Sequence, residues 1–294
     1  MKSITLGIAV SFLACAFAGC GGGIESRPTI TAKPKPGQAV GNGGVVAKTN
    51  GGTNGKKNGG GGTGTLSGVI KYTGDAPKIG LAAGYTNKDP YCTANKSKIK
   101  DESLIVGTNK GLANVILFLD RKPRGYTAPK PPADPALFDQ KFCTFVPHVL
   151  SVRVGQTVEL KNSDDTTHNT HITPNNNEGY NKSLGKGKDF YTYANREKGP
   201  VKVVCDAHTW MYAYHLPLDH PFVFVTKNDG AFTIEGLPAG THNFKIWHEK
   251  GGVIESVPVT IRAGETTTLN RSYGAAKLSR FRGPRPKVVV FSPR

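Results

Sequence analysis

The run Cys205-Asp206-Ala207-His208-Thr209-Trp210-Met211 constrains this chain more than any other segment. It places a thiolate, an imidazole and a thioether within seven residues, and Met211 is the only methionine besides the first residue. A second imidazole, that of His168, lies upstream. Two histidines, one cysteine and a weak axial methionine form the ligand set of a blue-copper electron-transfer site. The fold therefore has to bring two separate segments together at one point.

The rest of the sequence predicts an all-β fold, because its 37 glycines and 20 prolines separate short runs of β-prone residues. These runs cover residues 67–72, 113–120, 149–154, 157–161, 200–205 and 212–226. The run 113–120 is apolar enough for a central strand. Residues 149–154 and 157–161 alternate on either side of Gly155-Gln156, a pattern that predicts a half-buried hairpin.

The formal net charge of +17 is concentrated outside the region of the candidate ligands. Residues 271–294 contain no acidic residue and residues 21–64 are also basic, whereas residues 123–218 hold 11 basic and 9 acidic residues. The sequence contains no nucleic-acid-binding module, so we expect no nucleic-acid partner. Anionic membrane or cell-wall surfaces suit the basic segments better. The alternative is that these segments are simply solvated.

Residues 1–20 are a predicted export signal and are excluded from the fold. Lys2 precedes a mostly apolar stretch, Ile4 to Phe17, which is too short to cross a bilayer as a helix. The stretch ends in Phe17-Ala18-Gly19-Cys20, which resembles the lipobox of a bacterial lipoprotein, although phenylalanine replaces the usual leucine. The resemblance implies a lipid on Cys20 and a membrane-anchored protein that faces the periplasm or the cell surface. Ordinary secretory cleavage is the alternative, and either route exports the mature chain.

Two segments are predicted to lie outside any folded core. Residues 21–64 hold 15 of the 37 glycines and predict a flexible, disordered linker between the membrane and the folded part. Residues 274–294 are a predicted basic tail.

The cysteines also indicate a free thiol. Cys15 lies in the signal and Cys20 is the predicted lipid carrier, so that Cys92, Cys143 and Cys205 remain. An odd number of cysteines in an exported protein indicates one thiol with a function of its own. A disulfide between Cys92 and Cys143 would leave Cys205 for the metal. The alternative is that Cys92 and Cys143 are two isolated buried thiols.

A second fold is indicated near the C-terminus. Residues 225–242 contain two strand-like runs, an Asn228-Asp229-Gly230 turn and a Pro238-Ala239-Gly240 turn. They resemble the end of a carboxypeptidase regulatory-like (transthyretin-like) β-sandwich, whose opening strands residues 67–70 and 113–115 resemble.

This resemblance implies a small sandwich that is split in the sequence. Residues 65–122 would supply its first strands and residues 219–273 the others. A copper-binding module, residues 123–218, would then be an insertion between the two parts. The alternative is two consecutive domains that divide near residue 222.

Residues 140–215 resemble a cupredoxin of the amicyanin and plastocyanin branch. Three motifs carry the match: the G-x-x-V-x-x-x-N pattern from Gly155 to Asn162, the H-N-x-H pattern from His168 to His171, and the short C-x2-H-x2-M loop. The resemblance implies a Greek-key β-sandwich that binds one type 1 copper ion per chain. Its ligands would be His168, Cys205, His208 and Met211, with His171 as the alternative to His168.

The resemblance also assigns roles around the metal. His208 would lie near the surface in an apolar patch and serve as the electron port. Asn169 would hydrogen-bond across to the ligand loop and hold Cys205. Trp210 would form a docking patch, shield the metal or simply pack in the loop.

Three loop residues depart from the amicyanin-like pattern, and a fourth residue has an open role. Ala207 and Thr209 stand where prolines are usual, and Asp206 places a carboxylate beside the thiolate. Negative charge near the metal favours Cu(II), so Asp206 predicts a lowered reduction potential. His148 would either shield the site or pack.

The predicted function is electron transfer with a redox partner protein, without an enzymatic reaction. Copper enzymes need further copper centres, usually built from H-x-H and H-C-H pairs, and the sequence contains no H-x-H. The alternative is a cell-surface binding or scaffold module with a cupredoxin-like fold that stores copper or does not use it. The sequence indicates no oligomeric state.

Overall fold

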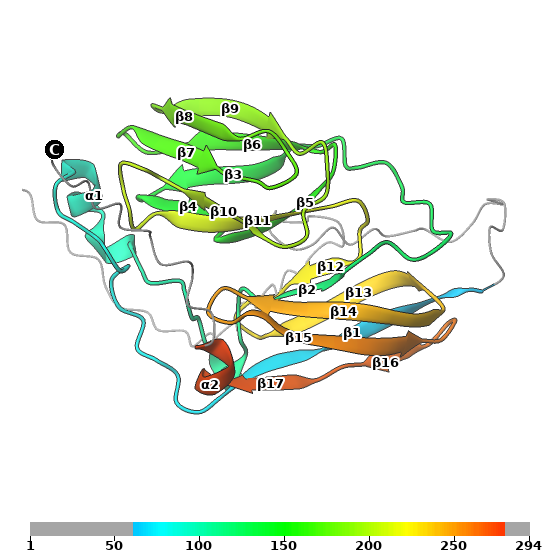
Figure 1. The fold of residues 1–294 in the computed structure, drawn as a ribbon. Coiled ribbons are helices and arrows are strands. Elements are labelled where there is room, and N and C mark those ends of the chain that lie inside the picture. The colour runs from blue at the N-terminus through cyan, green and yellow to red at the C-terminus, as the bar shows by residue number, and fades with distance from the viewer. Residues whose placement is uncertain (1–60, 280–294) are drawn as a thin grey trace, which may run out of the picture. The chain divides into compact units, whose positions relative to one another are not determined.

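The computed structural model describes residues 61–279, and most of its regular elements are strands (Figure 1). The predicted all-β class is therefore confirmed. The strands are β1 (Thr63–Thr73), β2 (Ile116–Leu119), β3 (Ala136–Lys141), β4 (Thr144–Val146), β5 (Val149–Arg153), β6 (Thr157–Asn162), β7 (His168–Ile172), β8 (Tyr180–Leu184), β9 (Gly187–Thr192), β10 (Val201–Val204), β11 (Tyr212–Leu218), β12 (Val223–Val225), β13 (Ala231–Pro238), β14 (Gly240–His248), β15 (Gly252–Ile261), β16 (Thr266–Thr268) and β17 (Arg271–Gly274).

The helices of the described part are short. They are α1 (Pro90–Ala94), α2 (Ala275–Leu278) and the 3-10 turns η1 (Lys96–Lys98) and η2 (Thr108–Lys110). Within residues 61–279, none of them is long and apolar enough to cross a membrane.

Several predicted segments fall outside the described residues. These are the export signal with Cys20, the linker up to residue 60 and the tail from residue 280. At the two boundaries the structure extends the fold: β1 already begins at Thr63, inside the predicted linker, and α2 lies inside the predicted tail.

One β-sandwich consists of two four-stranded sheets. The first has the order β13-β1-β16, with β17 also pairing with β1, and the second has the order β12-β2-β14-β15. Apolar side chains from both sheets meet in one core that includes Leu66, Ile70, Leu117 and Phe244. All four residues of β2 are buried, which fits its place between β12 and β14. The alternating burial along β15 is that of a strand with one face on a core.

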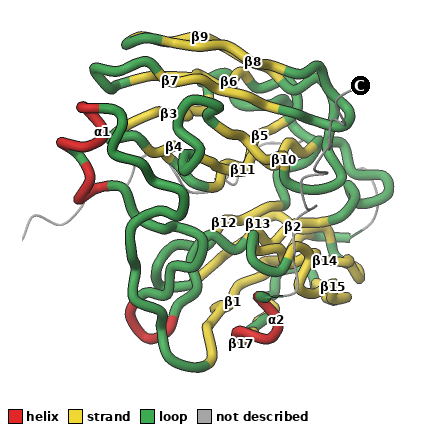
Figure 2. The backbone as a smooth tube through the Cα atoms, turned by 60° about the vertical axis from the view of Figure 1, so that its left-hand side comes forward, coloured by secondary structure: helices red, strands yellow, loops and turns green. Residues whose placement is uncertain are grey.

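This sandwich takes its strands from both ends of the described chain. β1 and β2 precede residue 122, and all their strand partners follow residue 222. The strands between them, β3 to β11, build two other sheets (Figure 2).

The second sandwich contains a five-stranded sheet, β5-β11-β10-β7-β8, and a four-stranded sheet, β4-β3-β6-β9. Its core includes Phe138, Phe145, Val158, Leu160 and Val203. β10 lies in the middle of the larger sheet, antiparallel to both β7 and β11. The ends of these three strands therefore meet at one edge of the sandwich.

The predicted hairpin between residues 149–154 and 157–161 is wrong. β5 pairs with β11 and β6 pairs with β3 and β9, so the turn at Gly155 carries the chain from one sheet to the other. β6 buries alternate side chains, whereas every residue of β5 except Ser151 is buried. Leu150 and Val152 of β5 lie in the same core as Val158 and Leu160 of β6. Gly155 has φ +81°, a conformation that glycine adopts without strain.

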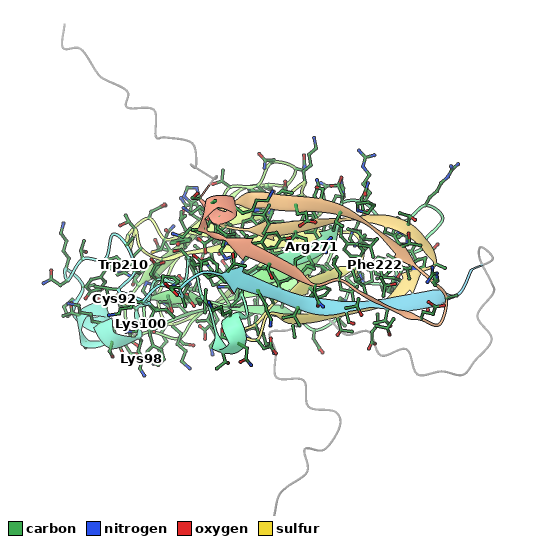
Figure 3. All side chains as sticks on the ribbon, turned by 90° about the horizontal axis from the view of Figure 1, so that it is seen from below. Cys92, Lys98, Lys100, Trp210, Phe222 and Arg271 are labelled. Atoms are coloured by element: carbon green, nitrogen blue, oxygen red, sulfur yellow. A yellow bond between two sulfur atoms is a disulfide. The ribbon has the colours of Figure 1, made fainter. Side chains whose placement is uncertain are left out.

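The segment between β1 and β2 contributes to the second core. Ala82, Cys92 and Ile99 are buried in the cluster that also holds Phe145 and Trp210. Cys92 forms a disulfide with Cys143. The sequence predicts all of residues 65–122 in the other sandwich, but this segment packs into the second core. Figure 3 shows Cys92 and Trp210 at the same end of the described part.

The disulfide predicts a large effect on stability. Its cysteines are 51 residues apart, and closing a loop of that size restricts the unfolded chain by about 4 kcal/mol. We expect the Cys92→Ala, Cys143→Ala double variant to lose up to about 4 kcal/mol in urea unfolding of the metal-free protein. The natural chain after reduction should unfold at the same midpoint as the variant. Equal midpoints for the oxidised natural chain and the variant would contradict the prediction.

Candidate metal centre

The ends of three paired strands position the predicted ligands. His168 is the first residue of β7, Cys205 directly follows β10, and Met211 directly precedes β11. The loop between Cys205 and Met211 is closed by two backbone hydrogen bonds. The N–H of Cys205 donates to the carbonyl of Met211 at 3.1 Å, and the N–H of Met211 donates to the carbonyl of His208 at 2.8 Å. These bonds fix His208 in the loop that follows β10.

Three of the four predicted ligand side chains converge. Nδ1 of His208 lies 3.0 Å from Nδ1 of His168 and 3.7 Å from Sγ of Cys205. One donor atom from each residue lies within 4.8 Å of the other two. All three residues are buried, with exposed fractions of 0% for His168, 1% for Cys205 and 7% for His208. Met211 is 1% exposed and belongs to the same core as Cys205.

The donor atoms fit a first-row transition metal. A bound ion lies about 2.0 Å from an imidazole nitrogen and about 2.3 Å from a thiolate sulfur, so one ion can bridge donors that are up to about 4 Å apart. The separations of 3.0 and 3.7 Å meet this condition. A thiolate with two imidazoles, next to a thioether, is a soft donor set that suits copper.

The environment of Cys205 favours its thiolate. Burial alone would raise the pKa of this thiol, but hydrogen bonds from His168, His208 and the backbone N–H of Asn169 outweigh burial and lower the pKa to about 6. The N–H of Asn169 lies 3.4 Å from Sγ. At neutral pH the sulfur is therefore in the form that binds a metal.

Asp164 orients the ring of His168 by contacting its outer nitrogen, Nε2. Its Oδ2 lies 2.8 Å from Nε2 of His168, and its carboxylate also accepts hydrogen bonds from the backbone N–H groups of Phe142 and Cys143. Burial raises the pKa of Asp164, but these hydrogen bonds outweigh it and hold the pKa below its ordinary value. The ionised carboxylate accepts the Nε2–H of His168 and leaves Nδ1 facing Cys205.

Asp89 lies at the outer nitrogen of the His208 ring in the same way. Its Oδ2 lies 3.5 Å from Nε2 of His208 and accepts a hydrogen bond from the hydroxyl of Thr166 at 2.7 Å. Its Oδ1 accepts the backbone N–H of Cys92, so Asp89 also caps α1. Although burial raises its pKa, these hydrogen bonds and the nearby His208 lower the pKa of Asp89 overall.

Neither Asp164 nor Asp89 is among the site residues predicted from the sequence. Asp164 stands four residues before His168, a spacing that is visible in the sequence. Asp89 precedes Pro90, a typical start of a helix, but nothing in that pattern relates it to His208, which follows more than a hundred residues later.

The predicted surface position of His208 is wrong. Its ring is buried beneath Asp89 and beside Trp210, whose ring centroid lies 5.0 Å away. Trp210 is itself buried, contacts Tyr85 and donates its Nε1–H to the carbonyl of Cys143 at 3.1 Å. Of the three roles considered for Trp210, the structure fits shielding and loop packing. The α1 segment covers the place where an exposed imidazole was expected.

Asn169 joins the ligand strand to the ligand loop. Besides the contact of its N–H with Cys205, its Oδ1 accepts the backbone N–H of Asp206, and its Nδ2 donates to Asn181. The carboxylate of Asp206 accepts the Nδ2–H of Asn181 at 3.1 Å and is 51% exposed. It lies 3.0 Å from Nδ1 of His171. His171 is therefore turned to the surface and lies outside the cluster of donors.

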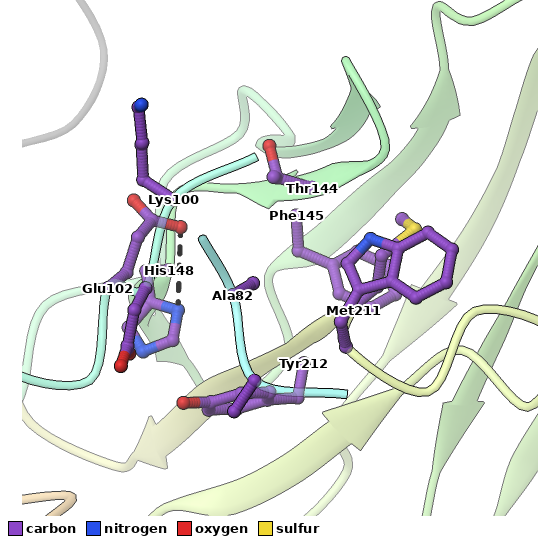
Figure 4. A pocket seen from close by; sticks show the side chains of 11 residues that line it. Ala82, Lys100, Glu102, Thr144, Phe145, His148, Met211 and Tyr212 are labelled. Carbon is purple, nitrogen blue, oxygen red and sulfur yellow. Dashed lines mark ion pairs between the residues drawn. The ribbon is translucent and has the colours of Figure 1, made fainter. Parts of the chain in front are cut away.

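His148 lies in a small pocket beside the ligand loop, which Trp210, Met211 and Tyr212 also line (Figure 4). Its Nε2 lies 2.6 Å from Glu249, in the turn between β14 and β15, and its Nδ1 lies 3.8 Å from Glu102. Burial lowers the pKa of His148, but these carboxylates outweigh it and raise the pKa. His148 thus links the two sandwiches and is not among the clustered donors.

Comparisons with known proteins give matches among solved structures alone, since no family model and no curated protein matches the chain. A copper-containing nitrite reductase from Thermus scotoductus SA-01 is 24% identical over 33% of this chain and 25% of that chain, with a TM-score of 0.27. An oxidized amicyanin mutant is 21% identical over 28% and 80% of the two chains, with a TM-score of 0.25.

A purple cupredoxin from Nitrosopumilus maritimus is 20% identical over 29% of this chain and 100% of that chain, with a TM-score of 0.25. The matched part of the nitrite reductase is a quarter of its length. Each of these likenesses covers a third of this chain or less.

The acidity of Cys205 can be measured in the metal-free protein. We expect its thiolate absorbance to titrate with a midpoint near pH 6 instead of 9.0. His168→Ala should raise that midpoint because it removes a hydrogen bond to the sulfur, whereas His171→Ala should leave it unchanged. Since the folded pKa lies below the unfolded one, the thiolate's contribution to stability is complete above pH 9.0 and is lost as the pH falls to about 6. A midpoint near 9 in the natural chain would contradict the prediction.

Proposed function

We propose that this chain is a type 1 copper protein that carries single electrons outside the cytoplasm while tethered to a membrane. The observation that carries the proposal is the buried convergence of His168, Cys205 and His208, with one donor atom from each within 4.8 Å of the other two. Met211 would complete the ligand set from the end of the same loop. When bound, a copper ion alternates between Cu(II) and Cu(I) and so takes up and releases one electron.

The residues around the donors would keep them fixed in both oxidation states. Backbone hydrogen bonds hold Cys205 and Met211 at the ends of the loop, and Asp164 and Asp89 hold the outer nitrogens of the two imidazoles. The core around the loop is closely packed, which limits side-chain movement. Donors that move little when the charge changes favour fast electron exchange.

The proposal includes export, a lipid on Cys20 and a redox partner protein. The disulfide between Cys92 and Cys143 supports export, because disulfides persist in oxidising compartments. Since His208 is covered, the accessible side chains next to Cys205 include those of Asp206, Ala207 and His171. A partner would therefore meet the polar groups of Asp206 and His171 there.

The proposal assigns no catalytic reaction to the chain. Among residues 61–279, the groups of side chains that could hold a metal all overlap around His168 and His208. Two of these groups include Cys92 or Cys143, whose sulfurs are tied in the disulfide. The proposal therefore rests on one centre within residues 61–279.

A second candidate function is copper storage or binding on the cell surface. The burial of His208 beneath Asp89 favours it, since a covered imidazole hinders electron exchange with a partner.

Adding Cu(II) to the purified chain tests the first candidate. We expect an intense visible charge-transfer band that saturates at one copper per chain, because a thiolate bound to Cu(II) absorbs strongly. Cys205→Ser should abolish the band and His168→Ala should abolish or shift it. His171→Ala, which removes an imidazole outside the cluster, should leave the band unchanged.

A colourless complex would contradict the type 1 site. Where the band forms, mixing the Cu(I) and Cu(II) proteins separates the two functions. Rapid self-exchange, followed by the broadening of nuclear magnetic resonance lines, fits a carrier. Exchange too slow to detect fits storage.

The two carboxylates nearest the ligands predict shifts of different size in reduction potential. Asp164→Asn should raise the potential by about 60 mV, a tenfold change in the one-electron equilibrium, because a buried negative charge stabilises Cu(II) strongly. Asp206→Asn should raise it by less than half as much, because its carboxylate is 51% exposed and screened by water. Redox titration of the visible band measures both shifts. A larger shift for Asp206→Asn would refute this ranking.

A further inference from the structure

A larger cavity lies beside the edge strands β5 and β12, away from the candidate metal centre. Its volume is about 300 Å³, and Pro129, Pro132, Val152, Pro221 and Val223 form its apolar walls. This size and this lining are typical of a site for a small organic molecule.

The cavity and the metal centre lie at opposite ends of β11. Arg153, which lines the cavity, pairs with Leu218 at the last position of β11, whereas the ligand loop joins the strand before Tyr212. Seven residues of strand span about 20 Å. Figure 3 likewise labels Phe222, which stands between the cavity residues Pro221 and Val223, far from Trp210.

The cavity wall contains a buried positive charge whose hydrogen bonds are incomplete. Arg153 is 8% exposed, and its Nη2 donates to the carbonyl of Pro129 at 3.0 Å. Its Nε is buried and has no hydrogen-bond partner among the described residues. Burial lowers the pKa of Arg153 and outweighs Tyr126 and Asp219, which are near enough to raise it. Oδ1 of Asp219 is likewise buried without a hydrogen-bond partner among the described residues, and no ion pair joins Asp219 to Arg153. A buried N–H group without an acceptor is costly.

The polar side chains that line the cavity do not supply the missing acceptor for the Nε–H of Arg153. Gln156 uses its Oε1 to accept the backbone N–H of Arg153 and its Nε2 to donate to the carbonyl of Asp134. Lys130 adds a second positive charge at the exposed side of the cavity. A water molecule would satisfy the Nε–H but would leave the apolar walls unfilled.

We propose that this cavity binds a small amphiphile, a carboxylate on a short apolar tail. The carboxylate would accept the Nε–H of Arg153 and face Lys130, and the tail would lie against the prolines and valines. This site is independent of the metal centre and of the function proposed for it.

Calorimetric titration of the full chain with octanoate and with octanol tests the proposal. The two probes share a tail and differ in the charged head. We expect octanoate to bind, and Arg153→Gln to weaken it by about tenfold or more while octanol binding stays unchanged. Val223→Trp, which fills the cavity, should weaken both probes.

A surface variant and two controls keep the result interpretable. Lys130→Glu should weaken octanoate severalfold without touching the core, and it serves if Arg153→Gln fails to fold. Thermal unfolding reports the folding of each variant, and the visible copper band reports the metal centre separately. Absence of octanoate binding, or equal binding of octanoate by the natural chain and both charge variants, would overturn the proposal. Binding that arises only after removal of residues 280–294 would also overturn it, by assigning the cavity to the chain's own tail.

Discussion

The antiparallel pairing of β10 with β7 on one side and β11 on the other is the constraint on which the candidate metal centre depends. It places Cys205 between the start of β7 and the end of the ligand loop. The backbone N–H of Asn169 therefore reaches the sulfur of Cys205, and the backbone N–H of Cys205 donates to the carbonyl of Met211. These bonds belong to the backbone of a packed sandwich. The donors of His168, Cys205 and His208 therefore converge at the ends of strands that the sandwich itself holds in place.

A segment from outside the sandwich completes this site. The chain from Ala82 to Ile99 precedes all nine strands of the second sandwich, yet it is buried in their core and fixed by the disulfide to Cys143. It carries Asp89 to the outer nitrogen of His208, while Asp164 serves His168 from the strand connection. Carboxylates in these positions fix the orientation of the rings and raise their basicity as ligands. The second sandwich therefore includes, besides its own strands, a segment that lies between β1 and β2 in the sequence.

Much of this arrangement is predictable from the sequence wherever the signal is local. The C-x2-H-x2-M spacing names three predicted ligands, and the apolar run around β2 predicts a central strand. The hairpin prediction for β5 and β6 fails because alternation reports which side chains face a core, and two strands in opposite sheets satisfy it equally well. The covering of His208 is not predictable, since Asp89 meets it only through the tertiary fold.

The covering segment also limits how a carrier of this design would work. The side of His208 is closed by Asp89, Trp210 and Tyr85. The disulfide joins this cover to Cys143, in the turn between β3 and β4, and the carbonyl of Cys143 also accepts the indole N–H of Trp210. A cover fixed in this way does not open through side-chain motion alone. Electron exchange would then use the short covalent path from Cys205 to the exposed Asp206, next to His171. In the proposed carrier, the cover that fixes the ligand geometry would thus also determine which surface a redox partner approaches.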